Sequence, residues 1–287
     1  MSKVTLYIEN SDINNTIVIN SGCTYFTGEK EYINCVTQLK GSIFADGYFP
    51  RNDWRELTED EKKRLIVYHP PQINYETVGI YNIPNDIYQK FANFRDTKFT
   101  SYLQIKELMD KPTYQKNIQL LKDFILAFAF DKNDFDLKTL RCVHHLNLET
   151  STMNNKTNTL IGIHLDKWDK NCGWHQKKLA RNRVCINLGK DSRYFIVLNR
   201  TLHQMYDMLS EETKANMNHK NITNSILQLF INEYPRYPLM KIEIKPGQMY
   251  MAPTENIFHD GSSINMKHMD ISITALGHFT MRKLNNA

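Results

Sequence analysis

The sequence predicts an α+β fold with a sandwich or barrel of β-strands in the second half of the chain and a helical layer contributed by the first half. From residue 140 onward, short β-branched or apolar runs alternate with turn residues, a spacing that favours a sandwich or barrel over βαβ units. Residues 58–131 instead carry helical patterns. No repeat or low-complexity linker interrupts the 287 residues, so we predict a single domain.

The first 139 residues are predicted to form strands and helices that pack on the barrel. Thr58 followed three residues later by Glu61 is a capping-box pattern, which marks the start of a helix. Apolar residues recur at helical spacing between residues 114 and 130. The predicted elements are short strands at residues 4–8 and 16–19, a helix from Thr58 to the Pro70-Pro71 pair, and a helix over residues 114–130.

Residues 140–287 are predicted to form the β core. A helical insertion at about residues 202–231 interrupts this core, and Ser210 before two glutamates marks a helix start within it. The expected strands cover residues 140–148, 159–165, 183–188, 194–198, 241–244, 248–252 and 270–279.

Composition and charge narrow the class of function. Apolar residues make up 41% of the chain and charged residues 23%, as in a soluble globular protein. The net charge of +5 is spread along the chain without a basic block, so nucleic-acid binding is not expected. The longest apolar run, residues 124–130, is far shorter than the roughly 20 residues of a membrane span, so no membrane association is expected.

The cysteine pattern predicts a cytoplasmic protein. The five cysteines are odd in number, scattered, and contain no CxxC pair, so reduced thiols are the simplest interpretation. The N-terminus also lacks an apolar signal core. The sequence carries no signal for oligomeric state.

His164, Asp166 and the distant His259 have the residue types and spacing of one metal site. Residues i and i+2 of a strand share a face, so His164 and Asp166 can reach the same ion. The Pro246-Gly247 turn begins a return strand that leads to His259. Mixed nitrogen and oxygen ligands with open coordination positions suit Fe(II) better than Ca or Mg. Zn is a competitor because of its affinity for such ligands. The alternative is a hydrogen-bonded pair in a loop and an unrelated surface histidine.

His164-x-Asp166, the turn at residues 246–248 with Pro253, and His259 resemble the motif set of the Fe(II)/2-oxoglutarate-dependent oxygenases. The resemblance covers about half of the chain. It implies a double-stranded β-helix (cupin-like, jelly-roll) core, with Fe(II), 2-oxoglutarate and O2 as cofactor and cosubstrates. It also implies oxidative decarboxylation of 2-oxoglutarate to succinate, coupled to C–H oxidation. Because Asp166 is present, halogenation is disfavoured, whereas desaturation and ring formation remain open.

The resemblance further implies a basic residue that binds the far carboxylate of 2-oxoglutarate. Many members place an Arg about ten residues after the distal His, but residues 266–272 contain none. Other branches place the basic residue on a strand soon after the HxD motif, where Arg183 fits, with Arg193 and Lys267 as alternatives. The other residues predicted to contact the cosubstrate are Asn187 and Ser272, with Asn182 and Thr274 as further candidates.

Residues that flank the ligands are candidates for substrate contacts, because loops at a barrel mouth commonly carry them. These are Trp168, Glu255, Asn256 and Asp260. One of the last three could instead hold the second ring nitrogen of His259. The adjacent His144 and His145 would point to opposite faces of a strand, so they are predicted to be structural.

Together these patterns predict a hydroxylase-type oxygenase acting on a small polar metabolite, such as an amino acid. Two alternatives stay open. One is a cupin-type iron dioxygenase or isomerase that does not use 2-oxoglutarate. The other is a metal-free jelly-roll module that binds a ligand or a protein.

Overall fold

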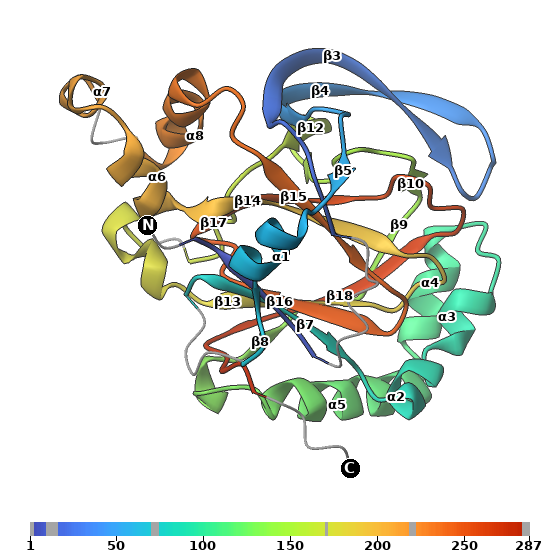
Figure 1. Cartoon of the computed structure of the whole chain (residues 1–287). Helices are drawn as coiled ribbons and strands as arrows, with labels where there is room; N and C mark the ends of the chain where they lie inside the picture. The colour runs from blue at the N-terminus through green and yellow to red at the C-terminus, as the bar shows by residue number, and fades with distance from the viewer. Residues whose placement is uncertain (1–2, 10–16, 70–74, 170–171, 218–221, 283–287) are drawn as a thin grey trace.

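The computed structural model describes residues 3–9, 17–69, 75–169, 172–217 and 222–282 (Figure 1). Three β-sheets and the helices around them give the α+β class that the sequence predicts. Thr16, Pro70 and Pro71 lie outside the described residues, so the predictions made for them are not addressed.

The largest sheet has eight strands among the described residues and presents one face to helices and the other to a second sheet. Val184 and Ile186 belong to the apolar cluster on the helical side, whereas Cys185 belongs to the cluster between the sheets, as strand alternation requires. The strand order is β6 (Ile66–Val67), β1 (Thr5–Ile8), β7 (Thr77–Asn82), β16 (Gln248–Ala252), β13 (Asn182–Asn187), β18 (Asp270–Gly277) and β8 (Asp136–Leu137), with β9 (Arg141–Val143) also paired to β18.

The second sheet faces the inner side of the first. Phe195, Val197 and Ile242 point into the interior between the two sheets, where they contact apolar residues of the larger sheet. The order of this sheet is β17 (Ile257–Ser262), β14 (Arg193–Thr201), β15 (Leu239–Ile244), β2 (Ile17–Ile19) and β5 (Arg55–Glu56). The candidate ligand His259 therefore lies on an edge strand of this sheet.

A third sheet is built around the long hairpin of β3 and β4, which arches over the top of the molecule in Figure 1. In this sheet β12 runs parallel to β4, and the backbones of the two strands are in close contact at Gly47 and Gly162. A Cβ atom on Gly47 would collide with the carbonyl of Ile161, and one on Gly162 with that of Tyr48. The order of this sheet is β10 (His145–Leu146), β3 (Cys23–Asn34), β4 (Lys40–Pro50), β12 (Thr159–Gly162) and β11 (Met153–Asn154).

Helices cover the outer faces of the eight-stranded sheet and of the sheet that contains β14 and β17 (Figure 1). The helices on the eight-stranded sheet are α2 (Asn85–Gln89), α3 (Ala92–Asp96), α4 (Tyr102–Met109) and α5 (Pro112–Leu126). On the outer face of β14 and β17 lie α6 (Leu202–Met208) and α8 (Ile222–Glu233), with α7 (Glu211–Ala215) between them in the chain. The remaining helices are α1 (Glu59–Leu65) and the 3-10 helices η1 (Lys132–Asp134) and η2 (Trp174–Leu179).

Several local predictions are confirmed. Thr58 and Glu61 form a complete capping box at the start of α1, and Ser210 caps α7. The strand predicted at residues 248–252 is β16 with the same bounds. The cysteines Cys23, Cys35, Cys142, Cys172 and Cys185 are all free thiols.

Other local predictions are wrong or incomplete. The middle of the chain contains β7, a fully formed strand that the helical prediction for residues 58–131 missed. The first helix ends at Leu65, because the chain leaves it directly into β6 beside β1. The predicted helix over residues 114–130 ends at Leu126. The first 50 residues were expected to hold short strands, yet β3 and β4 span 12 and 11 residues.

Among the described residues, no helix is both long and apolar enough to cross a membrane.

Candidate metal centre

The side chains of His164, Asp166 and His259 converge at one point between β12 and β17. Their potential ligand atoms all lie within 4.8 Å of one another. The Nε2 atoms of His164 and His259 are 3.8 and 3.6 Å from the carboxylate oxygens of Asp166. His259 is 1% exposed and Asp166 is 8% exposed. Three donors of these types at this separation can share one metal ion.

Backbone pairing brings the two ligand segments together. The N–H of His164 donates to the carbonyl of His259 at 3.0 Å, and the N–H of His259 donates back at 2.9 Å. Two residues further on, the N–H of Asp166 donates to the carbonyl of Thr254 at 3.1 Å. Alternation then directs His164 and Asp166 to the same side, as the sequence spacing predicts.

Both imidazoles are held in the orientation that a metal ligand needs. The Nδ1–H of His164 donates to the carbonyl of Gly162 at 2.8 Å, and that of His259 donates to the carbonyl of Ile257 at 3.0 Å. Each Nε2 is therefore the basic nitrogen and is free to bind a metal. The Nε2 of His259 is buried and accepts no hydrogen bond from a described residue. A buried nitrogen without a partner is costly unless a metal or another ligand satisfies it.

Burial and the local charges keep His259 neutral and Asp166 ionised, the states that bind a metal, and they act in the opposite direction on His164. Burial lowers the pKa of His259 to about 3 although Asp166 lies beside it, so its imidazole is neutral. Burial opposes ionisation of Asp166, yet Arg183, His259 and His164 hold its pKa well below the usual range. Burial also disfavours protonation of His164, but the nearby carboxylates of Asp166 and Asp260 raise its pKa overall.

Two arginines enter the interior between the sheets near this centre. Arg183 places Nη1 3.4 Å from Oδ2 of Asp166. Arg193, at the start of β14, places Nη1 3.5 Å from Oδ1 of Asp270 and 3.5 Å from Sγ of Cys185. The Nε atoms of both arginines are buried without a hydrogen-bond partner in the described chain. Such unsatisfied donors favour an anionic ligand between the sheets.

The other predicted cosubstrate residues lie on β13, on β18 or in the loop before β18. The side-chain amide of Asn187 is fully used in the turn after β13, where it donates to the carbonyls of Asp191 and Ile244 and accepts from the N–H of Gly189. Ser272 is buried on β18, opposite Asn187. Of the further candidates, Thr274 lies opposite Cys185 and Asn182 opposite Gly277, while Lys267 lies in the loop before β18.

Glu255 is buried beside the loop that follows Asp166. Its Oε1 accepts hydrogen bonds from the backbone N–H groups of Trp168 and Asp169, the latter at 2.9 Å. Its Oε2 forms an ion pair with Lys177, and the two side chains are 1% and 6% exposed. In this arrangement Glu255 anchors the ligand loop. Sequence reasoning missed Lys177, because nothing in the sequence distinguishes it from the surface lysines around it.

The remaining predicted substrate residues point in different directions. Trp168 is 42% exposed, with the Nζ of Lys138 5.2 Å from its ring centroid. Asn256 donates to the carbonyl of Tyr75 at 3.3 Å. Asp260 is buried, and its Oδ1 accepts from the Thr152 hydroxyl at 2.6 Å.

The two adjacent histidines lie apart from the centre, as predicted. His144 is within 3.7 Å of the thiol of Cys35, and His145 contacts the Tyr32 ring at a centroid distance of 4.1 Å.

A cavity of about 630 Å³ opens beside the two ligands of the HxD motif. His164 and Asp166 contribute to its lining, together with the partly exposed aromatic residues Tyr25, Tyr48 and Trp168. This volume lies within the range of small-molecule sites.

Comparison with models of known protein families gives no match, and no curated protein sequence matches the chain. The functional argument therefore depends on the site itself: a buried His-Asp-His set that could hold a metal.

Proposed function

We propose that this protein is a non-haem iron oxygenase that uses 2-oxoglutarate and O2 to oxidise a C–H bond of a small-molecule substrate. The observation that carries the proposal is the convergence of His164, Asp166 and His259 within 4.8 Å. Two imidazoles and one carboxylate on one face of Fe(II) leave the other coordination positions open for cosubstrate and O2.

The strand order supports the double-stranded β-helix that the sequence resemblance implies. Of the described strands from β9 onward, β9 and β12 to β18 are numbered here from first to eighth; the two-residue strands β10 and β11, which belong to the third sheet, are left out of this numbering. The first, eighth, third and sixth are neighbours in the large sheet, as β9-β18-β13-β16. The seventh, fourth and fifth are neighbours in the second sheet, as β17-β14-β15. The backbone bridge between His164 and His259 places the second strand, β12, beside β17. This order is the one expected of two Greek keys in an eight-stranded jelly roll, and it supports that fold as part of the proposal.

The buried arginines support a dicarboxylate as cosubstrate. Arg183 contacts the metal ligand Asp166, so its charge lies close to the proposed iron. Arg193 is further away: its Nη2 would lie 3.1 Å from a Cβ atom on Gly261, two residues or about 7 Å along the strand from His259. We propose that Arg193 binds the far carboxylate, whereas Arg183 balances charge near the metal. Arg183 was the first choice from sequence, and Arg193 an alternative.

The residues of the chain have separate tasks in this proposal. His164, Asp166 and His259 would hold iron, which supplies the O2 chemistry when bound. The carbonyls of Gly162 and Ile257 keep each Nε2 directed at the ion. Burial of His259 and Asp166 excludes water, which strengthens the electrostatic interactions at the site.

The cavity beside His164 and Asp166 supports a substrate site at this position. Trp168, which the sequence predicted as a substrate contact, lines it with Tyr25 and Tyr48. Three aromatic side chains favour a substrate with an apolar or planar part over a wholly polar molecule such as a free amino acid.

The test is an anaerobic titration of the purified chain with Fe(II) and then 2-oxoglutarate, in which the visible charge-transfer band of the chelate is recorded. We expect one Fe(II) per chain and a band that requires 2-oxoglutarate. Asp166→Ala should lose both, while His175→Ala, which removes an exposed histidine outside the centre, should keep both.

The other outcomes decide between the alternatives. Iron binding without the band would contradict the use of 2-oxoglutarate and favour a cupin-type iron enzyme. No metal bound by the wild-type chain would favour a metal-free binding module and reject the oxygenase proposal.

A further inference from the structure

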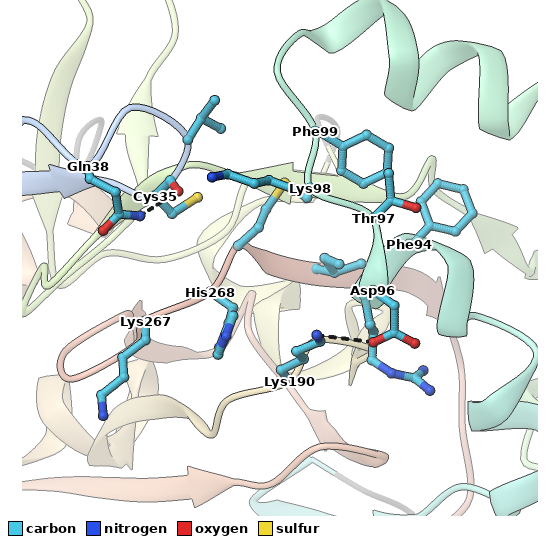
Figure 2. A pocket seen from close by; sticks show the side chains of 14 residues that line it. Cys35, Gln38, Phe94, Asp96, Thr97, Lys98, Phe99, Lys190, Lys267 and His268 are labelled. Carbon is cyan, nitrogen blue, oxygen red and sulfur yellow. Dashed lines mark hydrogen bonds and ion pairs between the residues drawn. The ribbon is translucent and has the colours of Figure 1, made fainter.

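A second cavity, shown in Figure 2, is lined in part by Lys190, which follows the end of β13. Its volume is about 320 Å³. Four segments meet there: the tip of the β3–β4 hairpin, the connection from α3 to α4, the turn after β13 and the loop before β18. Arg183, which contacts the metal ligand Asp166, is near the start of β13, whereas Lys190 of this cavity follows its end. The two sites are therefore separate.

The lining of this cavity is strongly basic. It contains Arg95, Lys98, Lys190 and Lys267 but only one acidic residue, Asp96, and it also contains His268. This is a formal excess of three positive charges, in a chain whose whole net charge is +5. Such a local excess attracts anions.

Two of the cations are available to a ligand. In Figure 2, Lys190 lies between His268 and Asp96, Lys98 extends toward Cys35, and Lys267 extends away from the other two lysines. Lys190 pairs with Asp96 at 3.1 Å, but the two side chains are 38% and 64% exposed. An ion pair this exposed is weak, so an incoming anion can compete for the lysine. Arg95 is engaged elsewhere, since its guanidinium stacks 3.8 Å from the Tyr88 ring centroid.

The floor of the cavity is apolar. Phe94, Phe99 and Ile271 are buried beneath it, with exposures of 4%, 3% and 2%, and Met269 also lines it. The loop that carries Met269 is held by Asp191, whose carboxylate accepts the N–H groups of Lys267 and His268, both at 2.7 Å. The cavity thus combines a fixed apolar floor with a basic rim.

We propose that this cavity binds an amphipathic organic anion, in which the negatively charged end lies at the basic rim that carries Lys98 and Lys190 and an aromatic or acyl body lies on Phe94, Phe99 and Met269. The charged rim provides long-range attraction and the floor provides apolar contact area. This site does not depend on the proposed oxygenase function, because it shares no residue with the metal centre.

The experiment uses 1-anilinonaphthalene-8-sulfonate as the probe and the neutral N-phenyl-1-naphthylamine, which has the same aromatic body without the sulfonate. Fluorescence titrations of the full chain measure the affinity of both. We expect the anion to bind more tightly than the neutral probe, and its affinity to fall as salt is added. The double variant Lys98→Ala/Lys190→Ala should weaken anion binding roughly tenfold, with each lysine contributing about half of the corresponding change in binding free energy.

The matched control is Lys63→Ala/Lys116→Ala, which removes the same charge from exposed positions on α1 and α5. It should leave the affinity within about twofold of wild type, since these lysines lie outside the cavity. Equal weakening in both double variants, or equal affinity for the two probes, would overturn the proposal. Circular dichroism confirms that each variant is folded before titration.

Discussion

His164 and His259 are joined by a reciprocal backbone bridge, with N–H to carbonyl distances of 3.0 and 2.9 Å. The pairing of the two segments therefore does not require the imidazole side chains. This separates the contribution of His259 to the fold from its contribution to the metal site, and each can be measured.

We expect His259→Leu to stabilise the metal-free chain in mildly acidic solution. The pKa of His259 is lowered from 6.5 to about 3, so below about pH 6.5 the unfolded chain takes up a proton that the folded chain does not. Stability is lost as pH falls through this window, by about 2 kcal/mol between pH 7.5 and pH 5. Urea unfolding with a chelator present should show this loss in wild type and a smaller loss in the variant. Identical pH slopes would contradict the assignment.

Arg193 and Arg183 should affect cosubstrate and metal differently. Arg193→Met removes a guanidinium that pairs with Asp270 and not with Asp166, so we expect 2-oxoglutarate affinity to fall about 10- to 100-fold with Fe(II) affinity unchanged. Arg183→Met removes the partner of Asp166 and should change both affinities. The control is Arg200→Met, which removes another buried arginine of β14. If Arg193→Met leaves 2-oxoglutarate affinity intact, Arg193 is not the carboxylate site.

Glu255 should set the metal affinity through the loop that follows Asp166. Replacing Glu255 alone would leave Lys177 buried and unpaired, at a cost of about 3–5 kcal/mol. The informative comparison is therefore between two double variants, Glu255→Gln/Lys177→Met and Glu255→Ala/Lys177→Met. The glutamine keeps an oxygen that can accept from the N–H groups of Trp168 and Asp169, whereas the alanine does not.

We expect the alanine double variant to bind Fe(II) about tenfold or more weakly than the glutamine one, as for other residues that orient metal ligands. Isothermal titration under anaerobic conditions gives both affinities. Equal Fe(II) affinities would mean that Glu255 supports the fold without orienting Asp166.

Gly162→Ala should disrupt both the fold around β12 and the metal centre. Gly162 has φ +65°, and a Cβ there would collide with the carbonyl of Tyr48. We expect a loss of at least about 2 kcal/mol of stability together with weaker Fe(II) binding. Gly173→Ala is the matched control, because its Cβ would meet nothing closer than 3.8 Å. A Gly162→Ala chain as stable as this control would contradict the close contact between β4 and β12.

The convergence of His164 and Asp166 in the candidate metal centre could be predicted from sequence because the signal of this pair is local. His164 and Asp166 are two residues apart, a spacing that fixes a shared face on any strand, and the turn at Pro246 indicates a return strand toward His259. The capping box at Thr58 could also be predicted, because Thr58 and Glu61 are only three residues apart.

Features that depend on distant partners were harder to predict. β7 forms because it fits between β1 and β16, and its short apolar run does not reveal those neighbours. Arg193 begins a strand whose inward face continues with Phe195 and Val197, and counting in steps of two from these residues would have pointed it into the interior. Lys177 is buried only because Glu255, far along the chain, is opposite it.

The close backbone contact at Gly47 and Gly162 makes the folding of the second half of the protein depend on the first half. A fragment that starts at residue 140 would contain every proposed iron ligand, yet it would lack β4. This is the strand with which β12 pairs, and His164 follows directly after β12. Shortening the protein, or exchanging its first half with that of another protein, would therefore have to preserve this hairpin.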